Sequence, residues 1–101
     1  MRMLMNVTIP HHLFNAAVKD GTVGKKIGKI LDAIKPEAVY FTEDGGERTA
    51  LMAINLTTPS DVPKFAEPFF LNFNAKCRFK VVMSPEDLKN AGLEALGKKW
   101  G

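Results

Sequence analysis

Few residues of this sequence have side chains suited to chemistry, and two of them are adjacent histidines. His11 and His12 directly follow the first apolar segment, and either imidazole suits a general base or a metal ligand. Adjacent positions on a helix diverge by about 100°, so the two rings would seldom bind one ion together. No third ligand stands near them in the sequence. We expect two exposed histidines in a first helical turn and no metal site; a ligand-binding role for His11 is the alternative.

A second set of polar residues alternates with apolar positions in segments that have the pattern of strands. These residues are Asn6, Tyr40, Asn55 and Arg78. On one face of a sheet they would suit an anionic or phenolic ligand, with the Arg78 guanidinium as its charge partner. The other interpretation is a polar seam that fixes the register between two copies of the chain, and the pattern favours this second one.

Two further residues have a chemical and a structural interpretation. Glu67 precedes Pro68 among phenylalanines, where a carboxylate with a raised pKa would be poised for proton transfer. An exposed acid at a helix kink is the preferred interpretation. Cys77 falls on an apolar face, which indicates an inert core residue. As the single cysteine, it excludes an internal disulfide and a cysteine-based metal cluster, and we expect no cofactor.

The segment Gly21-Thr22-Val23-Gly24 resembles the Gly-x-x-Gly backbone clamp of KH domains, which bind single-stranded nucleic acid. Lys25 and Lys26 follow the loop and fit that resemblance. Asp20 before the loop does not, and the final strand and helix are surplus to a KH module. The RNA-recognition motif needs stacking aromatics on its third strand, and the run 49–56 has none. Nucleic-acid binding is therefore an alternative and not the expected function.

Hydrophobic periodicity predicts the elements that would position these residues. Alternation predicts strands at 3–9, 38–42, 49–56 and 76–83, the middle two forming a hairpin about Gly45-Gly46. Apolar stripes predict helical regions at 11–34, with a break at 20–24, and at 57–74, with a kink or a second short helix near Glu67-Pro68. Ser84-Pro85 opens a final helix over 84–100.

This order of elements is the split βαβ, or ferredoxin-like, arrangement. It predicts an α+β fold in one domain, residues 1–101, with a four-stranded antiparallel sheet, both long helices on one face and an extra C-terminal helix.

The two faces of the predicted sheet differ in chemistry. The apolar face should lie under the helices and carries Met3, Met5, Val7, Ile9, Val39, Phe41, Ala50, Met52, Ile54, Leu56, Cys77, Phe79, Val81 and Met83. The half-polar face carries Leu4, Asn6, Thr8, Ala38, Tyr40, Thr42, Thr49, Leu51, Ala53, Asn55, Arg78, Lys80 and Val82. A face of mixed character usually packs on another sheet or surrounds a polar cavity. We therefore predict an isologous homodimer through it.

The element order and the half-polar face resemble the dimeric α+β barrel branch of the ferredoxin-like fold. More narrowly, the chain is similar to small uncharacterised bacterial proteins in its segments Ile9-Pro10, Asp20-Gly21-Thr22, Lys35-Pro36-Glu37-Ala38, Ala66-Glu67-Pro68-Phe69-Phe70, Phe73-Asn74-Ala75 and Val82-Met83-Ser84-Pro85-Glu86-Asp87-Leu88. The resemblance implies a fold and a dimer, and no reaction. Some barrel relatives are monooxygenases, isomerases or haem-degrading enzymes, so a small barrel enzyme of monooxygenase or isomerase type is an alternative.

Composition limits the binding partners and the cellular compartment that we expect. The net charge of +3 is mild, and we interpret the lysine groups Lys25-Lys26-Lys29 and Lys98-Lys99 as solvated helix faces. The first ten residues are too short and too polar for a signal peptide and no apolar run approaches membrane-spanning length, so we expect neither. The leading prediction is a cytoplasmic homodimer that binds a small molecule, either in the barrel or under the kink at Glu67–Phe73.

Overall fold

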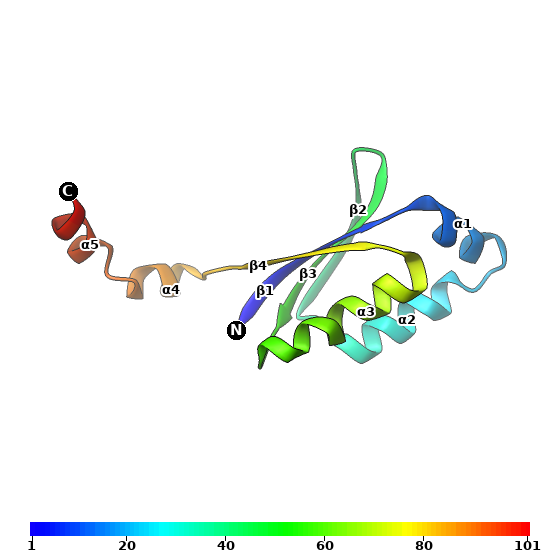
Figure 1. Ribbon diagram of the computed structural model, residues 1–101, viewed down its shortest axis with the longest axis horizontal. Helices are drawn as coiled ribbons and strands as arrows, with labels where there is room; N and C mark the ends of the chain where they lie inside the picture. The colour runs from blue at the N-terminus through cyan, green and yellow to red at the C-terminus, as the bar shows by residue number, and fades with distance from the viewer.

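One antiparallel sheet of four strands, in the order β2-β3-β1-β4, forms the centre of the protein (Figure 1). The computed structural model describes residues 1–101, with strands β1 (Arg2–Ile9), β2 (Ala38–Asp44), β3 (Glu47–Asn55) and β4 (Lys76–Val81). The strand order and the order of elements confirm the predicted α+β, ferredoxin-like architecture.

Helices α2 (Val23–Ile34) and α3 (Val62–Phe73) cover one side of the sheet, and α1 (His11–Lys19) lies beyond the end of β1 (Figure 1). A 3₁₀ turn at Pro59–Asp61 precedes α3. The predicted break between α1 and α2 is present. It is centred on Gly21, which has a φ of +80° that L residues adopt only under strain. The turn lets α2 run back beside α3, where the two helices pack together.

Strand register follows the prediction for the hairpin. Thr42 pairs with Thr49 and Tyr40 with Leu51. Because side chains alternate, the paired strands present two distinct faces. The helix-side face is packed with the main apolar core, in which Met5, Val7 and Ile54 are completely buried.

Four residues depart from the predicted burial. Phe41, Val81 and Met83 were expected under the helices, yet their side chains are 56%, 59% and 65% exposed. Phe41 and Val81 lie on the two edge strands and Met83 follows the end of β4, where the helices cover the sheet least. Thr49, expected to face a partner, is only 2% exposed in the single chain, because it lies on a central strand between Thr8 and Thr42.

Helix α3 continues through Pro68, so no second helix begins there. The proline has no N–H to donate to the preceding turn. On the following turn, the Asn72 Nδ2 group donates to the Pro68 carbonyl oxygen at 2.8 Å. The helix ends at Asn74, whose left-handed backbone (φ 56°) forms the cap.

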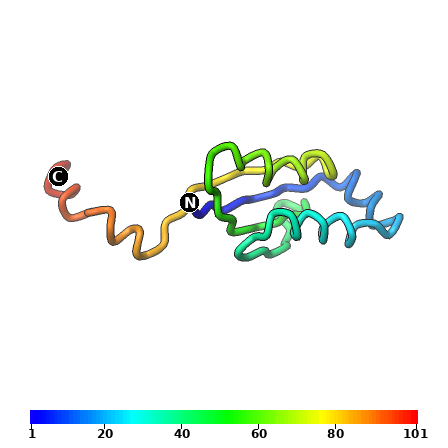
Figure 2. The backbone as a smooth tube through the Cα atoms, turned by 90° about the horizontal axis from the view of Figure 1, so that it is seen from below, coloured from blue at the N-terminus to red at the C-terminus, as the bar shows by residue number.

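The C-terminal segment leaves the sheet and extends away from the domain (Figures 1 and 2). It forms two helices, α4 (Pro85–Asn90) and α5 (Leu93–Trp100), in place of the single helix expected over 84–100. Gly92 separates them with a φ of +73°, which a continuous helix does not accommodate. All residues from Pro85 onward are exposed. We refer to residues 85–101 as the arm.

The arm dominates the shape of the molecule. The radius of gyration is 17.1 Å, against roughly 13 Å for a compact domain of this length. None of the helices combines the length and the hydrophobicity that crossing a membrane requires.

Candidate functional site

Three of the predicted site residues lie together in one row across the sheet. Tyr40 pairs with Leu51, Leu51 with Asn6, and Asn6 with Arg78. We call these four positions the Tyr40–Arg78 row. The Arg78 Nη2 atom lies 3.4 Å from Asn6 Oδ1, the acceptor of a long hydrogen bond. Asn55 faces the same way but pairs with Arg2 at the far end of β1, so it lies outside this row.

The row belongs to a sheet face that no helix covers. We define the uncovered face by Leu4, Asn6, Thr8, Ala38, Tyr40, Thr42, Thr49, Leu51, Ala53, Asn55, Lys76, Arg78 and Lys80. Its β4 edge carries three exposed cations, at 76, 78 and 80. Its centre is apolar or hydroxylic. The Tyr40 ring on the β2 edge is 71% exposed, which is unusual for an aromatic side chain that serves only a core.

Two hollows open on the uncovered face. The larger, about 340 Å³, is lined by Thr8, Asp44, Glu47, Lys76 and Arg78. The smaller, about 210 Å³, is lined by Leu4, Asn6, Arg78, Phe79 and Lys80. Arg78 belongs to both, and its guanidinium forms no ion pair. An anion entering either hollow would therefore meet an unneutralised, permanently charged group.

His11 connects α1 to the hairpin. Its Nε2 lies 3.1 Å from the Gly46 carbonyl oxygen, and its Nδ1 lies 3.2 Å from Arg48 Nη1. The guanidinium can only donate, so Nδ1 is the acceptor and Nε2 carries the proton that bonds to Gly46. The Arg48 guanidinium also stacks 4.5 Å above the Phe14 ring. This arrangement is structural and does not direct His11 toward Arg78. No group of three or more His, Cys, Asp or Glu residues is arranged to hold a metal ion.

The remaining two candidates lie away from the Tyr40–Arg78 row. Glu67 is exposed on α3. Cys77 is half-buried beneath the same helix, and its Sγ lies 3.9 Å from the Ala66 carbonyl oxygen. Burial raises the pKa of the Cys77 thiol to about 11. At neutral pH the thiol is protonated, as an inert core cysteine would be.

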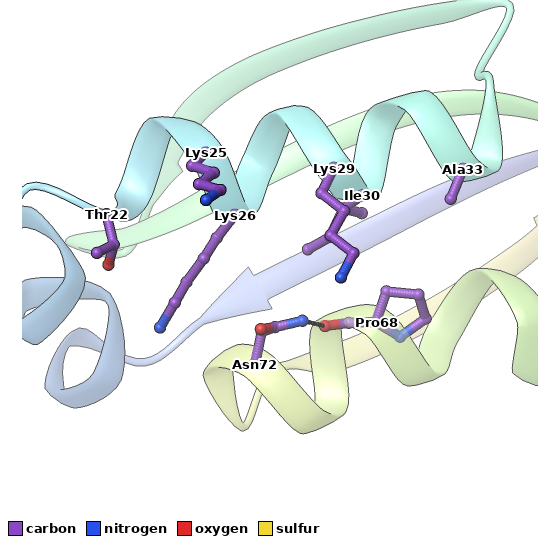
Figure 3. Close-up of a pocket in the computed structure, with 8 residues that line it drawn as sticks. All are labelled: Thr22, Lys25, Lys26, Lys29, Ile30, Ala33, Pro68 and Asn72. Carbon is purple, nitrogen blue, oxygen red and sulfur yellow. Dashed lines mark hydrogen bonds between the residues drawn. The ribbon is translucent and has the colours of Figure 1, made fainter.

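The largest cavity lies elsewhere, between α2 and α3 (Figure 3). Its volume is about 450 Å³, and its lining consists of Thr22, Lys25, Lys26, Lys29, Ile30, Ala33, Pro68 and Asn72. Sequence reasoning placed these lysines on a solvated helix face and did not identify the cavity. The signal available in the sequence was the spacing of three lysines directly after a helix start that has no acidic residue.

The loop that opens this cavity is held by its own side chains. The Asp20 carboxylate accepts hydrogen bonds from the Thr22 hydroxyl at 2.6 Å and the Thr22 N–H at 2.9 Å. These two bonds, with a smaller contribution from the charge of Lys26, hold the pKa of Asp20 below its ordinary value. These bonds hold the loop in the turn from which Thr22 lines the cavity.

Comparison with known proteins gives no family assignment: no protein-family model and no curated protein matches this chain.

Proposed function

We propose that the protein is a homodimeric small-molecule-binding protein whose two copies pack through the uncovered face. The observation that carries this proposal is the self-complementarity of the Tyr40–Arg78 row. A two-fold axis that lies between two stacked sheets, parallel to their strands, places β4 of one copy over β2 of the other. Packed sheets keep their strands within about 30° of each other, which such an axis allows.

In this arrangement each row meets itself in reverse order. Tyr40 faces Arg78 of the second copy, and Leu51 faces Asn6. A guanidinium over a tyrosine ring is a favourable cation–π pair. In the next row Leu4 faces Ala53 of the second copy, so a large side chain meets a small one. Alternation of large and small residues is what two interdigitating sheets require.

Charge supports the same arrangement. The acidic pair Asp44 and Glu47 lies one row beyond Thr42, on the hairpin side of the uncovered face. Lys76 is on the opposite edge, in the Thr42 row. The two-fold axis brings the acidic hairpin of one copy toward Lys76 of the other, twice per dimer. Complementary charges of this kind fix register and orientation more than they add affinity.

The oligomeric state tests the interface. Leu4→Asp places a charge at the centre of the uncovered face, and we expect it to convert a micromolar dimer to a monomer in light scattering. The matched control is Leu71→Asp, at an exposed leucine on α3, which should remain dimeric. A monomeric wild-type protein would contradict the proposal. The proposal would also be contradicted if Leu4→Asp remained dimeric and became monomeric only after removal of residues 85–101. The arm would then be the interface.

The ligand follows from the hollow of about 340 Å³ at Lys76 and Arg78, which the second copy would enclose. Its lining has two carboxylates, Asp44 and Glu47, and two cations, so a small molecule with an anionic group would bind at the cationic side, against the Arg78 guanidinium. Benzoate is a suitable probe: we expect it to shift the amide resonances of β4, and Arg78→Gln to abolish the shifts. Lys64→Gln on α3 is the control and should bind as the wild type does. Equal shifts in both variants would exclude Arg78 as the charge partner. The barrel-enzyme alternative would use this same hollow.

A further inference from the structure

The cavity between α2 and α3 has one charged and one apolar half (Figure 3). Lys29 extends from α2 toward α3, whereas Lys26 extends toward the end of the cavity beside α1 (Figure 3). The apolar half is formed by Ile30, Ala33 and Pro68. A volume of about 450 Å³ is within the range of roughly 300–1,000 Å³ that small-molecule sites occupy.

None of the lysines around this cavity forms an ion pair, although the charge of Lys26 interacts with the Asp20 carboxylate. The chain contains a single ion pair, between Arg2 and Glu37 at 2.8 Å, and it lies elsewhere. The cavity lining includes no carboxylate. Here α3 supplies Pro68 and Asn72, and its one carboxylate, Glu67, does not line the cavity.

The start of α2 adds to the positive potential. No side chain caps this helix, and its first turn contains no acidic residue. Lys25 and Lys26 thus lie near the positive end of the helix macrodipole, the end at which cations are unfavourable. The nearby Asp20 carboxylate, which accepts two hydrogen bonds from Thr22, offsets part of the charge of Lys26. A bound anion would relieve both the repulsion among the lysines and their conflict with the dipole.

We propose that this cavity binds a small organic phosphate of about the size of a nucleoside monophosphate. The phosphate lies between the amines of Lys26 and Lys29, and the uncharged, flat part of the molecule packs on Ile30, Ala33 and Pro68. The Asn72 side chain lies beside the ligand. This site is on the helix side of the sheet, so it does not depend on the uncovered face or on the proposed dimer.

Titration with adenosine monophosphate, followed by amide NMR, tests the site. We expect shifts confined to residues 22–33 and to the Asn72 side chain. The double variant Lys26→Ala/Lys29→Ala should weaken binding by about tenfold or more, because charge-assisted hydrogen bonds are lost. The control is Lys98→Ala/Lys99→Ala in the arm, which has the same change of net charge and should bind as the wild type does. Ala33→Phe should also weaken binding by filling the apolar half without a change of charge.

Two further probes separate the ligand classes. Inorganic phosphate should shift the same lysine segment but bind more weakly than adenosine monophosphate, because it lacks the part that packs on Pro68. A decamer of deoxythymidine should bind no more tightly than the mononucleotide. Tighter binding of the decamer would overturn the proposal in favour of a single-strand interface at Gly21–Gly24. Absence of localised shifts at millimolar mononucleotide, or equal binding by both double variants, would also overturn it.

Discussion

At the scale of single residues, environment determines which polar groups are available for chemistry. Arg78 is exposed and forms no ion pair and only a long hydrogen bond to Asn6, whereas Arg48 is held between His11 and the Phe14 ring. Two arginines on one sheet therefore have different roles: one binds neighbouring elements together, and the other is free to bind a partner or a ligand.

Cys77 should be chemically quiet. With its pKa raised to about 11 by burial, only a very small fraction of the thiol is ionised at pH 8. We expect it to react with a disulfide reagent at that pH roughly a hundredfold or more slowly than a free cysteine. The same reagent applied in guanidinium chloride is the control and should label the thiol rapidly. Rapid labelling of the folded protein would show that the thiol is accessible and ionised.

Asp20 should make the unfolding midpoint depend on pH in the acid range. Its pKa is lowered in the folded protein, chiefly by the Thr22 hydroxyl, from an ordinary value of 3.8. The stabilisation is therefore present above pH 3.8 and is lost as the pH falls through the lower, folded-state pKa. We expect wild type to unfold at a higher temperature than Asp20→Asn at pH 6, and the difference to narrow on acidification. A constant difference from pH 6 to pH 2 would mean that the charge contributes nothing.

The sequence predicted some of these residue-level features because they depend on local pattern. Asn6 and Arg78 both alternate away from apolar neighbours, so their common face followed from strand periodicity. The cavity did not follow, because it depends on how α2 is rotated against α3. That rotation depends on tertiary packing of the core, to which Ile30 of α2 and Phe69 of α3 both belong, and no short-range pattern specifies it.

At the scale of elements, glycines define where helices end. Gly21 has a left-handed backbone, while Gly28 lies within α2 and has open space where a Cβ would be added. We expect Gly21→Ala to lower the free energy of unfolding by about 1–2 kcal/mol. Gly28→Ala should instead raise it, by up to about 1 kcal/mol, because alanine favours the helix. Chemical denaturation of the two variants measures both effects. Equal effects would mean that the turn at Gly21 does not require a positive φ.

Glycine conformation accounts for one helix end that was predicted correctly and for one that was missed. The break at Gly21 was predicted from two closely spaced glycines. Gly92 was assigned to a continuous C-terminal helix, although its positive φ divides α4 from α5. A lone glycine in a helical pattern is compatible with a continuous helix or with a break, and packing normally decides between the two. The arm has no packing on its own domain to keep the helix continuous.

At the scale of the whole molecule, the arm and the domain are energetically separate. Removal of residues 85–101 deletes no buried side chain. We expect the shortened chain to unfold with a free energy within about 0.5 kcal/mol of the full chain, as for changes at exposed positions. Denaturation at low protein concentration measures this. A large loss of stability would show that the arm packs on the domain in solution.

The central position of β1 affects the order in which the protein can fold. β1 is the first strand in the sequence, yet it pairs with both β3 and β4, so that Met5 must meet Met52 on one side and Phe79 on the other. The hairpin of β2 and β3 is local and can form early. Pairing β1 with β3 and β4 instead closes long chain segments, which costs conformational entropy before the new contacts offset that cost. The apolar side chains of β1 therefore stay unprotected until nearly all of the domain has been synthesised. Nascent chains that stall before Lys76 should be the most prone to aggregate.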